Sequence, residues 1–308
     1  MPELKDWSGL GVGIELKNDS ALAVAVEPNG SIFDEFELLI EPEESTLDLA
    51  SRTIRSITGS SASIDSIGIA VPGLIDQRTG LLVHSKFIDL GSGEPVSERL
   101  SAATGVRIAL ENDANAAAIA EYQYGAGRGS KNMFYATLGE GIGAALIIDG
   151  SLWRGDSGFA GELGNIAINS EGMRLEEIAS SSNIVRRTQN RIHQDSTSSL
   201  SRLSEDEINI TEIVRAAKAE DDFALLMLER TGTYVGTAIA TVINLLNVEL
   251  IVIGGEIMDA GDVVLEAIIQ RAREFAYLPA FRTTRILRGS LGSKAAAIGA
   301  AMASKRTI

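Results

Sequence analysis

The chain has 308 residues, no cysteine and a formal net charge of −15. This length suits two domains with a cleft between them, because single hydrophobic cores stop growing at roughly 250–300 residues. The acidic balance argues against a dedicated nucleic-acid-binding surface, which would gather Lys and Arg against phosphates, and favours a small neutral ligand. The lack of cysteine excludes disulfides, thiolate zinc sites and thiol nucleophiles, and it fits a reducing, cytoplasmic compartment.

The sequence shows no export or membrane segment. Its first residues are acidic and polar, where a secretory signal needs a basic start followed by an apolar stretch. The longest apolar run, around residues 250–253, is far shorter than the ~20 residues that a membrane helix needs. We therefore expect a cytoplasmic protein without a membrane partner.

The first third of the chain predicts an α/β unit. Alternation of apolar with small or polar residues indicates two strands within Gly11–Val26 and a third at Ser31–Ile40. Helical spacing follows at Leu47–Thr58, and a short apolar strand at Ile64–Val71 ends at Pro72-Gly73.

A similar pattern returns later in the chain. Met133–Leu138 predicts a strand, Gly139–Gly143 a glycine turn, and Ala144–Ile148 a second strand. Two halves that each begin with a glycine-marked hairpin indicate a duplicated α/β fold that grips a ligand between its copies.

The last third again predicts helix, strand and helix, at Thr231–Leu246, Val248–Ile253 and Val263–Ala276. The terminal segment Ser293–Ser304 is nearly all alanine, glycine and apolar residues, which predicts a closely packed helix that returns to the first lobe. We expect a smaller first lobe of residues 1–112 plus about 292–308, and a larger second lobe of residues 113–291.

A carboxylate with amide neighbours lies at a predicted strand-to-helix junction. Glu111, Asn112 and Asp113 precede the alanine-rich helix predicted at Asn115–Tyr124. A side chain here can reach into a cleft while backbone amides stabilise its charge, and such a group can hold sugar hydroxyls. An ordinary helix cap explains the same residues.

Two glycine turns could serve a nucleotide. Gly139–Gly143 could bring backbone N–H groups to a phosphate, or it could be an ordinary hairpin turn. Glu140 in its middle would repel a polyphosphate unless a metal lay between them. Gly254 and Gly255 follow a strand at the place where open α/β sheets bind ligands, although a simple strand-to-helix turn explains them nearly as well.

A third glycine-rich segment presents Glu162 and Asn165 together, and Glu176 comes a little later. These groups could accept hydrogen bonds from a polyol, or they could belong to a surface loop. His84 and His193 are too far apart in sequence to suggest a metal site.

Taken together, these segments resemble the ROK family of repressors, open reading frames and kinases, from about Gly11 to Ala303. Val71–Asp76 is similar to the family's V-P-G-x-hydrophobic-D segment, and Glu111–Ala118 with Glu121 to its E-N-D-A-N-A-A-A-x-x-E signature. Leu138–Gly150 resembles L-G-T-G-I-G followed by I-I-D-G. Gly155–Gly164 resembles G-A-x-G-x-A-G-E-x-G.

The resemblance implies an actin-like (ribonuclease H-like) duplicated fold of two lobes, a hexose or hexosamine in the cleft, ATP with Mg²⁺ beside it in an active kinase, and a homodimer. Asp113 would be the general base on the acceptor hydroxyl. The other implied sugar-binding residues are Gly73, Asn112, Glu162, Asn165 and Glu176. The implied nucleotide-binding residues are Gly139, Gly141, Gly143, Gly254 and Gly255.

The sequence departs from the kinase pattern in both phosphate loops and at the zinc site. The first phosphate loop of the kinases reads D-x-G-G-T-K, whereas Glu15–Ser20 here lacks both glycines that let backbone approach a phosphate. Glu140 replaces the usual threonine of the second loop. Asn165 stands where the family has the histidine of its zinc site, and the cysteine-rich loop is cut short, so no zinc is expected.

These departures favour a sugar sensor whose kinase activity is lost or weak. The alternative is an active ATP-dependent hexose kinase that uses Asp113, with Lys17 and Mg²⁺ replacing the missing donors. A third hypothesis is an interaction protein that leaves the cleft unused. Regulators of the family normally carry an amino-terminal helix-turn-helix, for which the sequence has no room before Gly11, so a regulatory role would run through a protein partner or a missing DNA-binding part.

Overall fold

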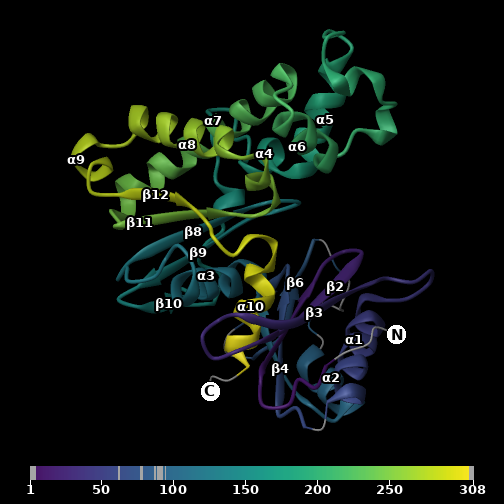
Figure 1. Ribbon diagram of the computed structural model, residues 1–308. Coiled ribbons are helices and arrows are strands. Elements are labelled where there is room, and N and C mark those ends of the chain that lie inside the picture. Colours follow the sequence, from purple (N-terminus) through teal and green to yellow (C-terminus); the bar gives the residue numbers. More distant parts are fainter. Residues whose placement is uncertain are drawn as a thin grey trace. The chain divides into compact units, whose positions relative to one another are not determined.

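The computed structural model describes residues 5–61, 63–76, 79–86, 88, 93 and 95–304 (Figure 1). The chain forms two compact units. The first comprises Met1–Arg128, Leu152–Ala160 and Lys294–Ile308, and the second comprises Gly129–Ser151 and Gly161–Ser293. The sequence placed the boundary at residue 113, but residues 113–128 belong with the first unit.

The first sheet has the strand order β3-β2-β1-β4-β7. The pairs β1/β2 and β2/β3 are antiparallel, whereas β4 runs parallel to both β1 and β7. These strands are β1 (Gly11–Leu16), β2 (Ser20–Val26), β3 (Ile32–Leu39), β4 (Ser66–Val71) and β7 (Arg107–Asn112). The hairpin, third strand and following strand that the sequence predicted are therefore confirmed.

The second sheet repeats this plan with the order β10-β9-β8-β11-β12. Its hairpin β8/β9 is antiparallel, and β11 runs parallel to β8 and β12. These strands are β8 (Met133–Leu138), β9 (Ile142–Ile148), β10 (Ser151–Trp153), β11 (Leu250–Gly254) and β12 (Arg285–Arg288). The matching order of the two sheets confirms the duplication predicted from the two glycine-marked hairpins.

The helices of the first unit complete its α/β layers. They are α1 (Thr46–Ser60), α2 (Val96–Thr104), α3 (Asp113–Tyr124) and α10 (Ala295–Ala303), and a small hairpin is formed by β5 (Leu74–Ile75) and β6 (Leu82–His84). Helix α1 begins with a reciprocal capping box between Ser45 and Asp48, which satisfies two backbone N–H groups that a helix start leaves without partners. Buried Leu49, Ile54 and Ile57 of this helix belong to the core that also contains the strands of the first sheet.

Helix α10 approaches its neighbours closely because it is built from small residues. A Cβ on Gly299 would lie 1.8 Å from the carbonyl oxygen of Ala116 in α3, and a Cβ on Gly68 of β4 would lie 1.8 Å from that of Ala300. Only glycine fits at such contacts. The predicted terminal helix is thereby confirmed, and it explains why α3 belongs with the first unit.

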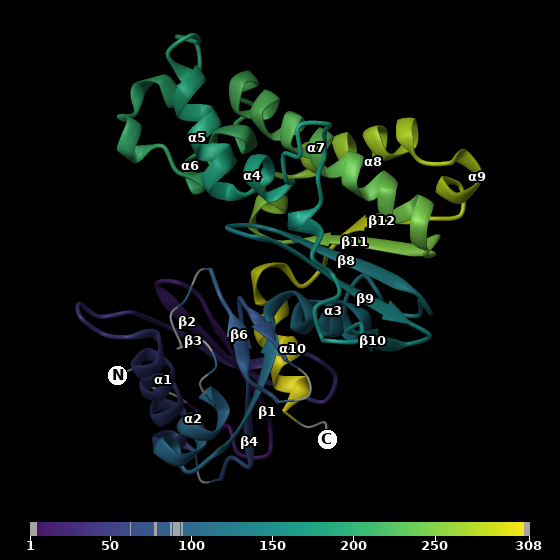
Figure 2. The same cartoon turned by 180° about the vertical axis from the view of Figure 1, so that it is seen from behind.

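The helices of the second unit cover its sheet, and Figures 1 and 2 show α7 and α8 side by side over one face. They are α4 (Glu176–Ala179), α5 (Ser181–Ile192), α6 (Ile210–Lys218), α7 (Asp222–Leu246), α8 (Asp262–Phe275) and α9 (Leu278–Phe281). Helix α7 begins earlier than the predicted Thr231, because Asp221 caps it by accepting from the N–H of Ala224. No helix among the described residues is both long and apolar enough to cross a membrane.

Candidate functional site

Asn112 and Asp113 have different roles at the start of α3, which the sequence did not distinguish. Asn112 is the N-cap of α3, since its Oδ1 accepts from the N–H of Asn115 at 3.0 Å. Its Nδ2 donates to the carbonyl oxygen of Gly73 at 3.1 Å and to Oδ1 of Asp113 at 3.0 Å. The structure therefore brings Gly73, Asn112 and Asp113 together, and the capping task falls to Asn112.

Asp113 is the first residue of α3, next to the positive end of the helix dipole. Its Oδ1 accepts from the N–H of Ala114 at 2.8 Å as well as from Asn112. Two donors on one oxygen fix the orientation of the carboxylate. A carboxylate held this way can accept a proton or a hydrogen bond from a hydroxyl group, which is what the predicted general base requires.

A buried ion pair that the sequence did not reveal lies beside these residues. Glu111 is only 4% exposed, and both of its oxygens bind Arg154, at 2.7 Å from Nη1 and 2.5 Å from Nη2. Oε1 also accepts from the backbone N–H of Asn112 and from Nδ2 of Asn115. This bidentate pair fixes the strand end that carries Asn112. No sequence signal connects two residues 43 positions apart.

Glu15, on β1, is a second carboxylate, and it interacts electrostatically with Asp113. Its Oε2 is buried and has no hydrogen-bond partner among the described residues. Burial is the largest cause that raises the pKa of Glu15 from 4.5 to about 7; the charges of Asp113 and Glu37 raise it further, and that of Lys17 opposes them. Near neutral pH this carboxyl therefore carries its proton much of the time and can act as a hydrogen-bond donor.

In the second unit, Gly139–Gly143 forms the turn between β8 and β9. The N–H of Gly139 donates to the carbonyl oxygen of Gly141 at 3.1 Å, and the carbonyl oxygen of Gly139 accepts from the N–H of Ser181 at the start of α5 at 2.8 Å. Gly143 pairs with Thr137 in the hairpin. The turn thus closes the β8/β9 hairpin and also contacts the first residue of α5, whereas its use as a phosphate loop stays a prediction.

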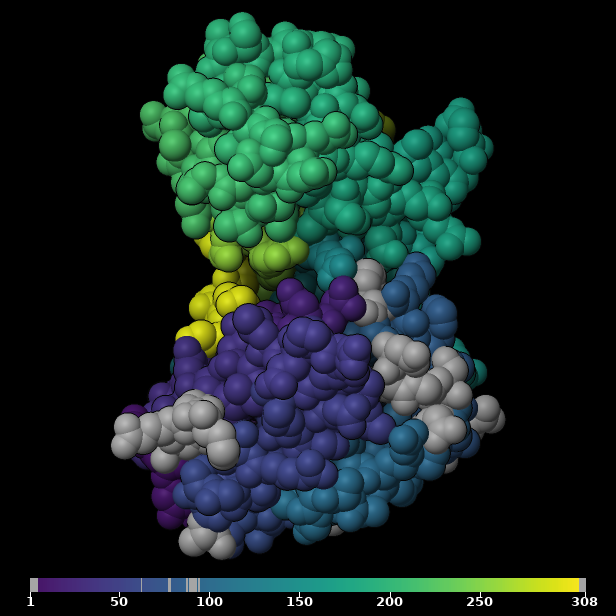
Figure 3. Space-filling view, turned by 90° about the vertical axis from the view of Figure 1, so that its right-hand side faces the viewer, coloured from purple at the N-terminus to yellow at the C-terminus, as the bar shows by residue number. Residues whose placement is uncertain are grey.

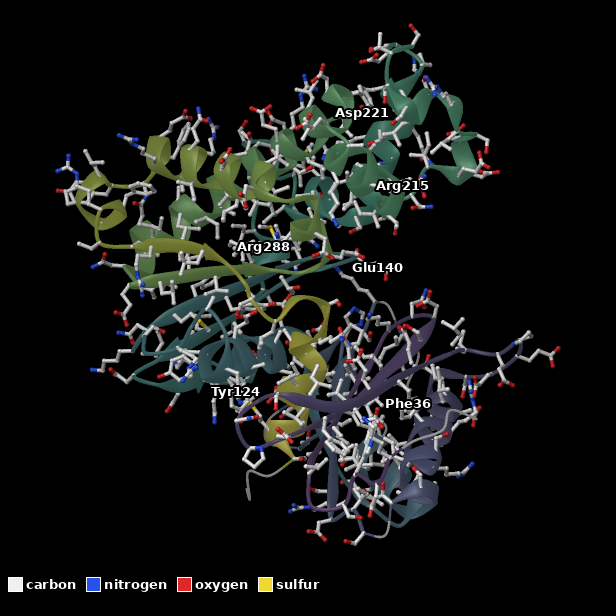
Figure 4. The ribbon with its side chains drawn as sticks, viewed as in Figure 1. Phe36, Tyr124, Glu140, Arg215, Asp221 and Arg288 are labelled. Atoms are coloured by element: carbon white, nitrogen blue, oxygen red, sulfur yellow. The ribbon has the colours of Figure 1, made fainter. Side chains whose placement is uncertain are left out.

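Three carboxylates flank this turn. Glu140, which Figure 4 labels, lies within the turn, and its side chain is exposed. Oε2 of Glu176 accepts from the N–H of Ile142 at 3.0 Å. Glu256 would contact a Cβ on Gly139 at 3.6 Å, and its Oε1 accepts from the hydroxyl of Ser181 at 2.6 Å. The surroundings of the turn are therefore acidic, which disfavours a polyphosphate.

Gly254 and Gly255 lie next to this turn because Gly254 pairs with Thr137 in the parallel ladder of β11 and β8. Gly255 has φ of 93°, and a Cβ there would lie 2.3 Å from the carbonyl oxygen of Leu138. Strand packing by itself thus requires this glycine. The carboxyl ends of β8 and β11 nevertheless form one edge, which is where open α/β sheets bind ligands.

Glu162, Asn165 and Glu176 lie around a single short turn. Nδ2 of Asn165 donates to Oε2 of Glu162 at 2.8 Å, and Arg174 donates to Oδ1 of Asn165 at 3.2 Å. A Cβ on Gly164, which lies between them, would be 3.2 Å from Oε2 of Glu176. The side chains of Glu162 and Asn165 are exposed and carry polar atoms suited to hydroxyl groups. Within the described ranges, no three acidic or histidine side chains gather as a metal ion would require.

Two sheets of equal strand order, with polar and glycine-rich segments at strand ends, define a duplicated α/β protein with an actin-like fold. Residues 12–307 match the model of the ROK family. The chain belongs to the ROK family.

Proteins with sequences similar to this chain include both enzymes and regulators. The chain is 30% identical to a protein named glucokinase from Halalkalibacterium halodurans, over 94% of this chain and 92% of that one. It is 29% identical to the DNA-binding transcriptional dual regulator NagC of Escherichia coli, over 99% of this chain and 77% of that one. Among solved structures, a ROK family glucokinase from Streptomyces griseus in complex with glucose and AMPPNP matches with a TM-score of 0.88 and 27% identity, over 97% of this chain and 100% of that one.

Proposed function

We propose that this ROK protein binds a hexose or hexosamine through Asp113 and transfers phosphate from ATP weakly or not at all, so that it acts as a sugar sensor. The relatives named glucokinase support a sugar as the ligand. The observation that best supports weak or absent kinase activity is the set of acidic residues around the Gly139–Gly143 turn.

The orientation of Asp113 supports the sugar part. Its Oδ1 is held by Ala114 and Asn112, and Asn112 is itself held by Gly73 and by its capping bond. A carboxylate fixed by its neighbours binds a hydroxyl group at a low cost in side-chain entropy. Glu162, Asn165 and Glu176 remain predicted sugar contacts.

The charges around the turn support weak phosphoryl transfer. Two like charges 4 Å apart repel by about 4 kcal/mol near a protein surface. Glu140, Glu176 and Glu256 all flank the turn that would receive phosphate groups. In addition, Glu140 occupies a position where a donor would be needed, and the loss of one such donor typically costs about 10²–10³ in rate.

The second candidate is an active ATP-dependent hexose kinase. Asp113 favours it, because a carboxylate at a helix start with one oxygen fully engaged is positioned to take the proton of an acceptor hydroxyl. ATP with Mg²⁺ would then be the phosphate donor, bound at the turns formed by Gly139–Gly143 and Gly254–Gly255.

Calorimetry and an ADP-release assay separate the two. Glucose, mannose, N-acetylglucosamine and N-acetylmannosamine are each titrated with and without Mg·ATP. We expect one of them to bind and expect Asp113→Asn to weaken that binding. We expect sugar-dependent ADP release below about 0.1 s⁻¹, since kinases typically reach about 1–100 s⁻¹. Turnover in the ordinary kinase range that Asp113→Asn abolishes would refute the sensor proposal.

A gain-of-function variant tests the cause of the weak activity. Glu140→Thr removes one negative charge and adds a hydroxyl donor at the turn, so we expect it to raise ADP release at least about 10-fold with sugar affinity unchanged. Glu171→Thr is the matched control, because Glu171 is exposed and does not flank the turn. An equal effect of the two variants would contradict the electrostatic argument.

A further inference from the structure

Four side chains of the second unit form a basic seam between α5 and α7. Arg187 and Arg191 lie one turn apart on α5, and Arg230 and Tyr234 lie one turn apart on α7. Residues four positions apart share a helix face, so each helix contributes one pair to the seam. Figure 3 shows in teal and green one face of the second unit, to which α5 and α7 belong.

Arg187 connects the two helices. Its Nη2 donates to Oγ1 of Thr231 on α7 at 2.6 Å, and Thr231 in turn donates to the carbonyl oxygen of Met227 at 2.9 Å. The guanidinium carbon lies 5.8 Å from the centroid of the Tyr234 ring, within the range of a cation–π contact. One hydrogen bond and one ring contact thus hold the group in place while most of its five donors are left for another acceptor.

The seam holds positive charge without a matching carboxylate. Across the ranges that the structure describes, Arg187, Arg191 and Arg230 take part in no ion pair, and the buried Nε of Arg187 has no acceptor. Burial is the first cause that lowers the pKa of Arg187, and the charges of Arg191, Arg230 and Arg186 lower it further, against the opposing effect of Tyr234. This arrangement is unusual in a chain that carries 42 acidic and 27 basic residues.

We propose that the basic seam binds a phosphate group, either as inorganic phosphate or as part of a small phosphate ester. A guanidinium fork matches a tetrahedral oxyanion in a bidentate manner, and three such groups suit a dianion better than a single carboxylate. Arg187 lies six residues beyond Ser181, roughly 9 Å further along α5, so the seam is separate from the Gly139–Gly143 turn. The inference does not depend on the proposed sugar-binding function.

Calorimetry on the full chain tests this proposal with two probes, sodium phosphate and glycerol 3-phosphate, each at an ionic strength matched with sodium chloride. We expect at least one probe to bind and expect Arg187→Met to weaken it about 10-fold or more, as the loss of charge-assisted hydrogen bonds predicts. Binding of both probes indicates free phosphate as a sufficient ligand, whereas binding of glycerol 3-phosphate alone indicates an ester.

Two further variants keep the test decisive. Arg191→Met changes an exposed side chain at the edge of the seam, so it also has to weaken binding even if Arg187→Met misfolds. Arg273→Met on α8 is the matched control, an exposed arginine outside the seam, and should leave the affinity within about 2-fold. The proposal is overturned if neither probe binds, or if the Arg191 variant binds as tightly as the Arg273 variant.

Discussion

Glu15 should make the first unit less stable as the pH rises through neutrality. Its carboxyl has a pKa of about 7 in the folded chain, against an ordinary value of 4.5. Between these values the folded state holds a proton that the unfolded state has released, so unfolding becomes easier as the pH rises. Each pH unit between the two pKa values lowers the free energy of unfolding by about 1.4 kcal/mol. The full loss of stability from below pH 4.5 to above pH 7 is therefore about 3 kcal/mol.

The variant Glu15→Gln removes this titration while keeping the shape of the side chain. We expect it to match the original chain in stability near pH 4.5 and to exceed it by up to about 3 kcal/mol at pH 8, with some of that gain offset by the lost attraction to Lys17. For a unit of this size the gain corresponds to roughly 5–10 °C in the midpoint of thermal unfolding.

Calorimetric scans at a series of pH values measure the difference between the two chains, in which the titration of all other groups largely cancels. Glu98→Gln is the control, because Glu98 is an exposed carboxylate on α2 of the same unit and is not among the charges that shift the pKa of Glu15. In parallel, the ¹³C resonance of the Glu15 carboxyl should titrate near pH 7. Stability curves for Glu15→Gln and the original chain that stay parallel from pH 4.5 to 8 would refute the reasoning.

Two further changes test the packing that supports Asp113. Arg154→Met should destabilise the first unit by about 3 kcal/mol in urea unfolding because it leaves Glu111 buried without its counter-charge; a loss below about 1 kcal/mol would show that the pair is dispensable. Gly299→Ala should destabilise the same unit by about 2 kcal/mol or more, because its methyl group would meet the Ala116 carbonyl. Gly59→Ala in α1 is the control, and it should be neutral or slightly stabilising because the space around Gly59 is open. Equal unfolding midpoints for the two variants would contradict the close contact at Gly299.

Much of the fold could be predicted from local sequence patterns. The alternation within Gly11–Val26 and Met133–Ile148 predicted both hairpins, because a strand half buried in a sheet imposes a period of two on its sequence. The small residues of the terminal segment predicted a closely packed helix. The predicted start of α7 was nine residues too late. The helix begins where Asp221 accepts a hydrogen bond from the backbone N–H of Ala224, and the apolar pattern used for the prediction does not register such a cap.

The sequence by itself determined the family and the duplicated α/β fold, because strand periodicity and glycine turns are local properties that each segment carries within itself. It also pointed to Asp113, since a carboxylate before an alanine-rich helix is visible in a few consecutive letters. Local backbone geometry at the start of α3 decided that Asn112 is its cap, and only the tertiary structure decided that Arg154 neutralises Glu111 and that Oε2 of Glu15 is buried without a hydrogen-bond partner among the described residues. The last two are facts about a pair distant along the chain and about solvent exclusion, and both arise only when strands and helices pack together.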